Sequence, residues 1–512
     1  MAKKKRPQRG NPQRRTPVSR SFEVPEARVV HAPETPAPAP AFWFGFEVPW
    51  AKLCTARVVL FGLLAIDAVL QLRHAPRYGA TDFNVAQLSF LDGLGAGRLA
   101  YGACQVALAL LFTSAALGVA TRFVLPIATA LYAWLYFGSQ LDSYQHHYMI
   151  ALVLAVSCFV PWQPRQAVVR SWAIRLILVE MGIVYLWAAV SKLDPVWLDG
   201  TALDSQITGS MRSLILGTVG FKVAAITVVV VELFLAFAVW LRPAWKLAAP
   251  IGLGLHLGIL ATGFEIGLFV YDMLALYILV IPDRIWRAAS EIGIFAKLGA
   301  LGRAIVNSAG PPMLGLAVLA GVPIALLCRL PHVFPLALIA LGVALIAMVR
   351  SQIKQQRPTA AAPLVVLVGL VLVFAVDRST TVAIDYYRFW GGSQRRIGDV
   401  AQAEQAYRGM LGIEPHSEIA HFYLGRILIQ TDRASEGLEH LHAAQRDEPG
   451  RARAFVEEAR YLVTVGRKPE AIAKAKDAVF ADPSDSDAKA LFDTLQGTAK
   501  PAGPKRPDPD DD

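Results

Sequence analysis

Several ionisable residues lie inside, or at the ends of, long apolar runs of this sequence. Charged and titratable side chains at membrane depth are costly, so each is a functional hypothesis whose partner must be found. For Asp67, Glu180 and Glu232 we favour a structural role in hydrogen bonds or salt bridges between helices. Glu265 and Asp272 lie near a helix end, where contact with water explains them equally well. The full set of candidates is Asp67, His146, His147, Glu180, Lys192, Glu232, His256, Glu265 and Asp272.

Lys192 belongs to the stretch "YLWAAVSKLDPVWLDG", which runs from Tyr185 to Gly200. Lys192 follows Tyr185 by seven residues and should therefore share its helix face, and Pro195 is expected to stop the helix just beyond it. A long cationic side chain at a helix end can reach the membrane interface, and periodicity alone favours this interpretation. Alternatively, a buried amine that stays neutral can accept a proton, a task for which arginine is unsuited.

The composition of the chain indicates which kind of element could hold these residues in an apolar surrounding. The 512 residues are 54% hydrophobic and 18% charged, and their mean hydropathy is +0.42, which is too apolar for a soluble chain of this length. Apolar runs of membrane-spanning length recur, and about eleven crossings are expected. We place them at residues 56–72, 100–119, 123–140, 148–162, 173–190, 222–241, 247–262, 266–281, 311–328, 333–349 and 363–377.

The charged residues indicate how these spans are oriented. Residues 1–50 are basic and then rich in Pro and Ala, which predicts a disordered tail without a cleavable signal peptide. Arg and Lys follow the fourth, sixth, eighth and tenth spans, whereas the loops "GSQLDSYQHHY" and "ATGFEIG" have none. The positive-inside rule therefore places the N-terminus in the cytoplasm and the C-terminus on the outer side of the cell membrane. This pattern explains the net charge of +10 better than nucleic-acid binding does.

The four cysteines predict neither a disulfide framework nor a metal site. Cys54, Cys104, Cys158 and Cys328 lie at or within apolar runs and have no paired spacing. Such isolated cysteines in apolar segments are expected to be packing residues.

Beyond residue 385 the sequence becomes soluble in character, and a repeat is visible. Pro415, Pro449 and Pro483 are spaced by 34 residues, and each closes a helical block. A 34-residue period with a terminating proline is the tetratricopeptide signature. Its usual role is to bind a protein or peptide, and a cap without a partner is the alternative. Small residues recur at the same phases of the repeat: Ala403, Gly437 and Ala471 in one helix, and Ala420, Ala454 and Ala488 in the next.

Ordered motifs across the apolar region resemble the vitamin K-dependent gamma-glutamyl carboxylases. "IVYLWAAVSKLDPVWLDG" is similar to the segment that holds the catalytic lysine of that family, "LDSYQHHYMIALVLAVSCFVP" to a histidine-bearing segment, and "LGLHLGILATGFEIGLFVYDMLALYILV" to a later one. With "ARVVLFGLLAIDAVLQ" and "FLDGLGAGRLAYG", the resemblance covers roughly residues 50 to 285, the region called the HTTM domain.

The resemblance implies a chemistry for three residues. Lys192 matches the base that deprotonates vitamin K hydroquinone, after which oxygen and carbon dioxide take part in modifying a peptide glutamate. His147 and His256 match two active-site histidines, although His256 is one residue further from "IGLF" than the family pattern has it. A histidine that binds interfacial water, or one that is satisfied within the core, is the structural alternative.

The sequence therefore predicts an all-α chain: a polytopic helical membrane bundle of about eleven spans followed by a soluble tetratricopeptide α-solenoid. In the favoured hypothesis it is a carboxylase-like lyase that uses a reduced quinone, oxygen and carbon dioxide, and the repeats recruit its protein substrate. The alternative is a non-catalytic membrane scaffold, and a transporter is weaker because no inverted repeat is visible. The expected parts are a tail at 1–50, an HTTM core at 51–285, further transmembrane helices at 286–385, repeats at 386–499 and an acidic tail at 500–512.

Overall fold

The computed structural model describes residues 46–79, 85–116, 118, 120–141, 145–162, 168–207, 209–262, 269–291 and 382–497. Glu265 and the spans expected at 311–328, 333–349 and 363–377 lie outside these residues. The acidic tail and most of the basic tail also lie outside them.

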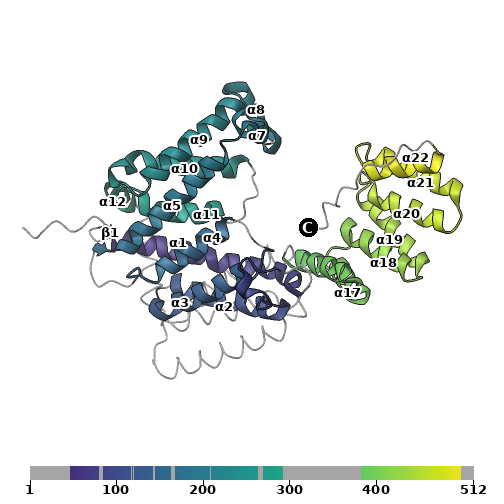
Figure 1. The fold of residues 1–512 in the computed structure, drawn as a ribbon, viewed down its shortest axis with the longest axis horizontal. Helices are drawn as coiled ribbons and strands as arrows, with labels where there is room; N and C mark the ends of the chain where they lie inside the picture. The colour runs from purple at the N-terminus through teal and green to yellow at the C-terminus, as the bar shows by residue number, and fades with distance from the viewer. Residues whose placement is uncertain are drawn as a thin grey trace, which may run out of the picture. The chain divides into compact units, whose positions relative to one another are not determined.

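The first part of the described chain is a bundle of apolar helices (Figure 1). Each packs against the next: α1 on α2, then α3, α4, α5, α9, α10 and α11 in turn, and α11 packs back against α1. Side chains exposed by 1% or less fill the space between them, including Leu53, Phe61, Leu64, Phe112 and Ile177. The helices are α1 (Trp50–Leu70), α2 (Arg98–Ala116), α3 (Thr121–Phe137), α4 (Gln145–Ser157), α5 (Trp172–Ser191), α9 (Phe221–Ala238), α10 (Trp245–Thr262) and α11 (Phe269–Val280).

Shorter elements connect these helices. The 3-10 helices are η1 (Gln71–Gly79), η3 (Ser89–Leu91) and η4 (Arg242–Ala244), and the short α-helices are α6 (Pro195–Leu198), α7 (Thr201–Gln206), α8 (Gly209–Thr218) and α12 (Asp283–Glu291). Two strands, β1 (Glu47–Pro49) and β2 (Val168–Arg170), form an antiparallel pair in which Val48 is opposite Val169. Apart from this short pair, the regular elements of the described residues are helices, and the all-α expectation is confirmed.

The strand pair also moves the boundary of the N-terminal tail. Phe46 is 1% exposed and Val48 is fully buried, so residues 46–50 belong to the bundle and not to the tail predicted at 1–50. No pattern in the sequence predicts this, because a three-residue strand is too short to show a periodic pattern.

Among the described residues, five helices are long and apolar enough to cross a membrane: Trp50–Tyr78, Arg98–Ala116, Trp172–Ser191, Phe221–Ala238 and Arg242–Thr262. Two shorter apolar helices cover His146–Ser157 and Phe269–Val280. Eight of the expected spans thus correspond to helices in the described part of the chain, but only five of these have the length that a perpendicular crossing needs.

A glycine allows close packing of the two helices that hold the principal candidate residues. A Cβ atom added at Gly182 of α5 would lie 2.4 Å from the carbonyl oxygen of Ala236 in α9. Small residues at such crossings let helix backbones approach, which is a common device in apolar bundles. α5 and α9 therefore run side by side, and their polar side chains can meet directly.

The second described part, residues 382–497, consists of paired helices (Figure 1). A helix over residues 382–396 precedes α17 (Val400–Leu411), α18 (Glu418–Gln430), α19 (Ala434–Asp447), α20 (Arg453–Thr464), α21 (Lys468–Ala481) and α22 (Ser486–Gln496). Successive helices pack together, and α18 also packs on α20, as α20 does on α22. This order of contacts is that of a stacked helical repeat.

The small residues predicted to repeat are buried where these helices cross. Ala403, Ala420, Ala454, Ala471 and Ala488 are each exposed by 1% or less. At the crossing of α18 and α19, glycines face one another: a Cβ atom on Gly425 would lie 2.8 Å from the Gly437 carbonyl oxygen, and one on Gly437 would lie 2.7 Å from the Gly425 carbonyl oxygen. The expected paired-helix packing is confirmed at these positions.

Candidate active site

Lys192 stands directly after the last residue of α5, and the chain turns there as expected. Asp194 accepts a hydrogen bond from the Trp197 backbone N–H at 3.0 Å, and Pro195 occupies the first position of α6. Proline suits this position because its missing N–H would be unsatisfied there in any case. The Lys-Leu-Asp-Pro sequence therefore ends one helix and begins another, and it places Lys192 at the junction.

The Lys192 ammonium is fully engaged. Its Nζ atom donates to both carboxylate oxygens of Glu232 in α9, at 2.8 and 2.9 Å, and to the Ala188 carbonyl oxygen at 3.1 Å. It also lies 5.2 Å from the ring centroid of Trp197. An ammonium has three donors and no acceptor, so this set of three oxygen acceptors fits the protonated amine. The side chains of Lys192 and Glu232 are 21% and 8% exposed, so the pair is reachable from only one side.

The sequence predicts that Glu232 pairs with a residue of another helix, and the structure shows that this partner is Lys192, the candidate base. The two residues are forty positions apart, on helices joined by three short ones. The sequence signal that could have predicted this ion pair is the presence of opposite charges in two neighbouring apolar runs. The alternative in which Lys192 only reaches outward to the interface does not fit this geometry, because its amine is turned toward α9.

Two turns before Lys192 on the same helix, Tyr185 lies at the centre of a buried polar cluster. Its hydroxyl is 2.6 Å from Nε2 of His256 in α10 and 2.9 Å from the hydroxyl of Tyr277 in α11. All three side chains are exposed by 3% or less. Gly252 makes room for the cluster, because a Cβ atom there would lie 1.9 Å from the Tyr277 hydroxyl.

The second ring nitrogen of His256 is available in this cluster for a further contact. Its Nδ1 atom is buried and has no hydrogen-bond partner within the described ranges. If Tyr185 donates to Nε2, then neutral His256 carries its proton on Nδ1 and offers it as a donor. Buried polar atoms are usually satisfied, so an open one indicates a place for water or a ligand.

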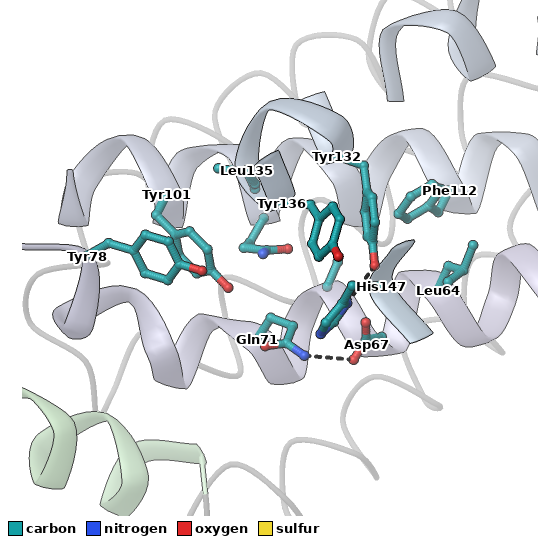
Figure 2. A pocket seen from close by; sticks show the side chains of 12 residues that line it. Leu64, Asp67, Gln71, Tyr78, Tyr101, Phe112, Tyr132, Leu135, Tyr136 and His147 are labelled. Atoms are coloured by element: carbon teal, nitrogen blue, oxygen red, sulfur yellow. Dashed lines mark hydrogen bonds between the residues drawn. The ribbon is translucent and has the colours of Figure 1, made fainter. Parts of the chain in front are cut away.

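His147 lies in the first turn of α4 and faces a separate pocket. Its Nδ1 atom is 2.7 Å from the hydroxyl of Tyr132 in α3, and its side chain is largely buried. Figure 2 shows its ring pointing into the pocket between Tyr132 and Asp67, where Gln71 donates to the Asp67 carboxylate at 3.2 Å. The cavity holds about 30 Å³, which is room for about two water molecules and too little for a quinone ring.

Aromatic rings connect the two histidine sites. His146 lies 4.2 Å from His147 and 6.0 Å from Phe269 of α11, measured between ring centroids, and Phe269 lies 6.4 Å from His256. Phe269 is therefore near both His146, the sequence neighbour of His147, and His256. No hydrogen bond joins Lys192 to either histidine within the described ranges, since each of the three binds a different partner.

Asp272 and Glu180 are the remaining ionisable candidates in the described residues. Asp272, in the first turn of α11, is 2% exposed, so the expectation that it meets water is not met. Its Oδ1 atom has no partner among the described residues, and the nearby Asp67 carboxylate repels it. Glu180 is half-buried in α5 and forms no hydrogen bond to another described residue. Within the same residues, no group of three or more His, Cys, Asp or Glu side chains could hold a metal ion.

Comparison with known proteins identifies one region. Residues 398–456 match the tetratricopeptide repeat family, which confirms the repeats predicted from the 34-residue period. The match covers α17, α18, α19 and the start of α20. A search of curated proteins found no significant match to the chain.

Proposed function

We propose that this chain is an integral membrane enzyme in which Lys192 and Glu232 move a proton at the outer mouth of the helical bundle. In this proposal a reduced quinone of the vitamin K hydroquinone type is the cofactor, and a glutamate of a protein substrate is modified. The observation that carries the proposal is the Lys192 ammonium with its three oxygen acceptors, two of them on Glu232. A purely structural helix end has no need of such an arrangement in an apolar surrounding.

The pair can act as a base only if Glu232 takes part. A protonated Lys192 cannot accept a proton, so its ammonium must first pass one to the Glu232 carboxylate, 2.8 Å away. The resulting amine has a lone pair and can remove a proton from an acidic hydroxyl beside it, while Glu232 holds the first proton. Glu232 therefore works as the proton acceptor that keeps Lys192 competent.

The residues at this mouth fit a reduced quinone in their chemistry. A phenolic hydroxyl needs an acceptor, which the Lys192–Glu232 pair supplies, and a quinone oxygen can accept from the open Nδ1 of His256. When bound, the quinol would supply, together with oxygen, a base strong enough to remove a γ proton from glutamate so that carbon dioxide can add. Exposed apolar side chains near Lys192 suit a ligand that arrives through lipid: Trp187, Val190, Leu193 and Val196.

The two histidines would support this site in different ways. Tyr185 fixes the ring of His256 by a hydrogen bond, and Tyr277 holds the Tyr185 hydroxyl in turn, so that the second nitrogen of His256 has one orientation. His147 faces a cavity of about two waters and is held by Tyr132, an arrangement suited to passing a proton to solvent. Both roles need only these side chains and water.

The repeats would recruit the protein substrate. Tetratricopeptide repeats generally bind proteins or peptides on the surface of their stacked helices. The charge pattern of the sequence supports a multi-pass protein of the cell membrane whose N-terminus is cytoplasmic and whose repeats lie on the outer side. Labelling of single cysteines introduced at Lys489 and Lys246 with a membrane-impermeant maleimide tests this: in intact cells only the first should react.

Quinol-dependent incorporation of labelled carbon dioxide into a glutamate-containing peptide tests the activity. Membranes that carry the protein should incorporate the label, and Lys192→Ala and Lys192→Arg should each lose at least 100-fold, because neither supplies a neutral amine. Lys222→Ala is the matched control, since Lys222 is an exposed lysine at the start of α9, at the same end of the bundle. Equal activity in all three variants would refute the role of Lys192.

The match to tetratricopeptide repeats favours a second candidate, a membrane scaffold that binds a protein partner. In that case no quinol or peptide supports incorporation, and the Lys192 variants retain every property of the wild type except stability. Capture of a partner should then depend on the repeats alone, so substitutions in the bundle would leave it unchanged.

A further inference from the structure

Positively charged side chains gather at the end of the bundle opposite to Lys192. Lys52 lies in the first turn of α1, Arg175 in the first turn of α5, and Arg242 begins η4, just before α10. The Arg175 position is 17 residues before Lys192 along α5, which corresponds to roughly 25 Å of helix. This cluster is therefore separate from the candidate active site.

The cations surround two aromatic rings. The guanidinium carbons of Arg175 and Arg242 each lie 5.0 Å from the ring centroid of Phe46. Trp245 lies 5.8 Å from Phe46, with Lys52 Nζ at 4.9 Å and the Arg242 guanidinium carbon at 5.5 Å from its ring. Cation–π contacts of this kind hold the three positive charges close together.

Their negative partner is shared. Lys52 Nζ donates to Asp283 at 3.0 Å and to the Ile281 carbonyl oxygen at 2.5 Å, while Arg242 lies 3.7 Å from the same Asp283 carboxylate. Within the described ranges Asp283 is the only carboxylate in an ion pair with Lys52 or Arg242, so these three side chains together carry one net positive charge. Arg242 also repels both Arg175 and Lys52 electrostatically, which an anion between them would relieve.

Other features place this cluster at a membrane interface. Trp50, Trp172 and Trp245 each begin a long apolar helix, at α1, α5 and α10. Tryptophan is enriched at the level of the lipid headgroups, and lysine and arginine on the cytoplasmic side. The helix dipoles of α1, α5 and α10 point their positive ends to the same side and add to the positive potential.

We propose that the Lys52–Arg175–Arg242 cluster binds the phosphate group of an anionic lipid headgroup at the cytoplasmic face of the bundle. Arg242, whose side chain is 39% exposed, is the part that the headgroup reaches, and Lys52, which is fully buried, fixes Asp283 at the rear. A guanidinium suits this task because its planar donors match phosphate oxygens. The proposal shares with the proposed function only the embedding of the helices in a membrane.

Native mass spectrometry of the purified full-length protein tests the proposal, with dioleoylphosphatidylglycerol, dioleoylphosphatidylcholine and inorganic phosphate as separate probes. The wild type should retain phosphatidylglycerol at least tenfold better than phosphatidylcholine. Arg242→Gln should lower that retention at least tenfold. Arg122→Gln should leave it unchanged, because Arg122 is an exposed arginine in the first turn of α3, outside the cluster.

A variant with the opposite expected effect distinguishes loss of lipid binding from loss of structure. Asp283→Asn removes the shared carboxylate, so phosphatidylglycerol should bind more tightly, by about threefold or more. Equal loss in the Arg242 and Arg122 variants, or unchanged binding in Asp283→Asn, would overturn the proposal. Inorganic phosphate that displaces the lipid at millimolar concentration would also overturn it, because the site would then be one for a free anion. None of these results depends on carboxylation.

Discussion

The apolar bundle and the repeat region both pack helices closely, but their charged side chains differ in the number of their charged partners. Both bring helices together at glycines, Gly182 in the bundle and Gly425 and Gly437 in the repeats. In the bundle, Lys192 and Glu232 form an isolated pair with little exposure. In the repeats, Glu404 lies between Arg408 and Arg433, and Glu436 binds the same two arginines. Among the described residues Glu232 has one charged partner, Lys192, whereas Glu404 and Glu436 in the repeats each have two.

This difference predicts how each region responds when a single partner is removed. A nearly buried charge left alone costs several kcal/mol, because the low dielectric strengthens both the attraction and the penalty for losing it. An exposed charge is solvated and screened, so the loss of one partner costs little.

The largest effect is expected from Glu232→Gln. It leaves the Lys192 ammonium without its carboxylate and should lower the free energy of unfolding by about 3 kcal/mol. The double variant Lys192→Met, Glu232→Leu should recover most of this loss, because it removes both charges and keeps similar volume. Thermal unfolding in detergent measures both. A double variant that is no more stable than Glu232→Gln would show that the ion pair is not the cause.

An intermediate effect is expected in the repeats, where Glu458 of α20 is 6% exposed. Burial alone would raise the pKa of Glu458, but hydrogen bonds from Gln445, His442 and Lys474 outweigh it and lower the pKa below its usual value. The carboxylate therefore stabilises the fold at neutral pH, and this contribution is lost as the pH falls through the lowered pKa. Glu458→Gln should cost about 1.5–3 kcal/mol at pH 7.

The pH dependence separates this effect from a change in packing. The difference between wild type and Glu458→Gln should shrink as the pH falls from the usual glutamate pKa of about 4.3 through the lowered pKa, below which both side chains are neutral. Amide hydrogen exchange of α20 and α21 in the full-length protein measures it. Glu439→Gln, at an exposed position of α19, is the control and should exchange as the wild type does at every pH. A difference that is constant with pH would contradict the assignment.

The smallest effect is expected from Glu404→Gln, because its partners Arg408 and Arg433 are 41% and 44% exposed. Burial tends to raise the pKa of Glu404, but hydrogen bonds from Arg408 and Arg433 lower it overall. Because both arginines also bind Glu436, the loss should be less than about 1 kcal/mol and should disappear in 1 M salt. Exchange protection of α17 with and without salt measures it. A loss as large as that of Glu232→Gln would break the comparison between the two regions.

Much of the helical framework was predictable because its signals are periodic. The 34-residue spacing of Pro415, Pro449 and Pro483 predicted the repeats, which the family match confirms, and the small residues at fixed phases predicted where their helices cross. The apolar runs predicted the bundle helices, although α1 begins at Trp50 and not near residue 56. Element ends were less predictable than element identities, because they depend on capping and on short strands such as β1.

The partners of the candidate site residues could not be predicted from the sequence. The sequence identified Lys192, His147 and His256 as chemically active types in apolar segments. It could not show that Lys192 binds Glu232, that His256 binds Tyr185, or that His147 binds Tyr132, since each pair joins different helices.

The sequence by itself determined that this protein has an apolar helical part and a tetratricopeptide part, because hydropathy and repeat period are local properties of the chain. Only the tertiary structure decided which charges are neutralised by which partners. It paired Lys192, at the end of α5, with Glu232 of α9, and it brought Lys52, Arg175 and Arg242 from three distant segments together around Phe46 and Trp245. Helix packing sets these distances, and no local pattern of residues encodes them.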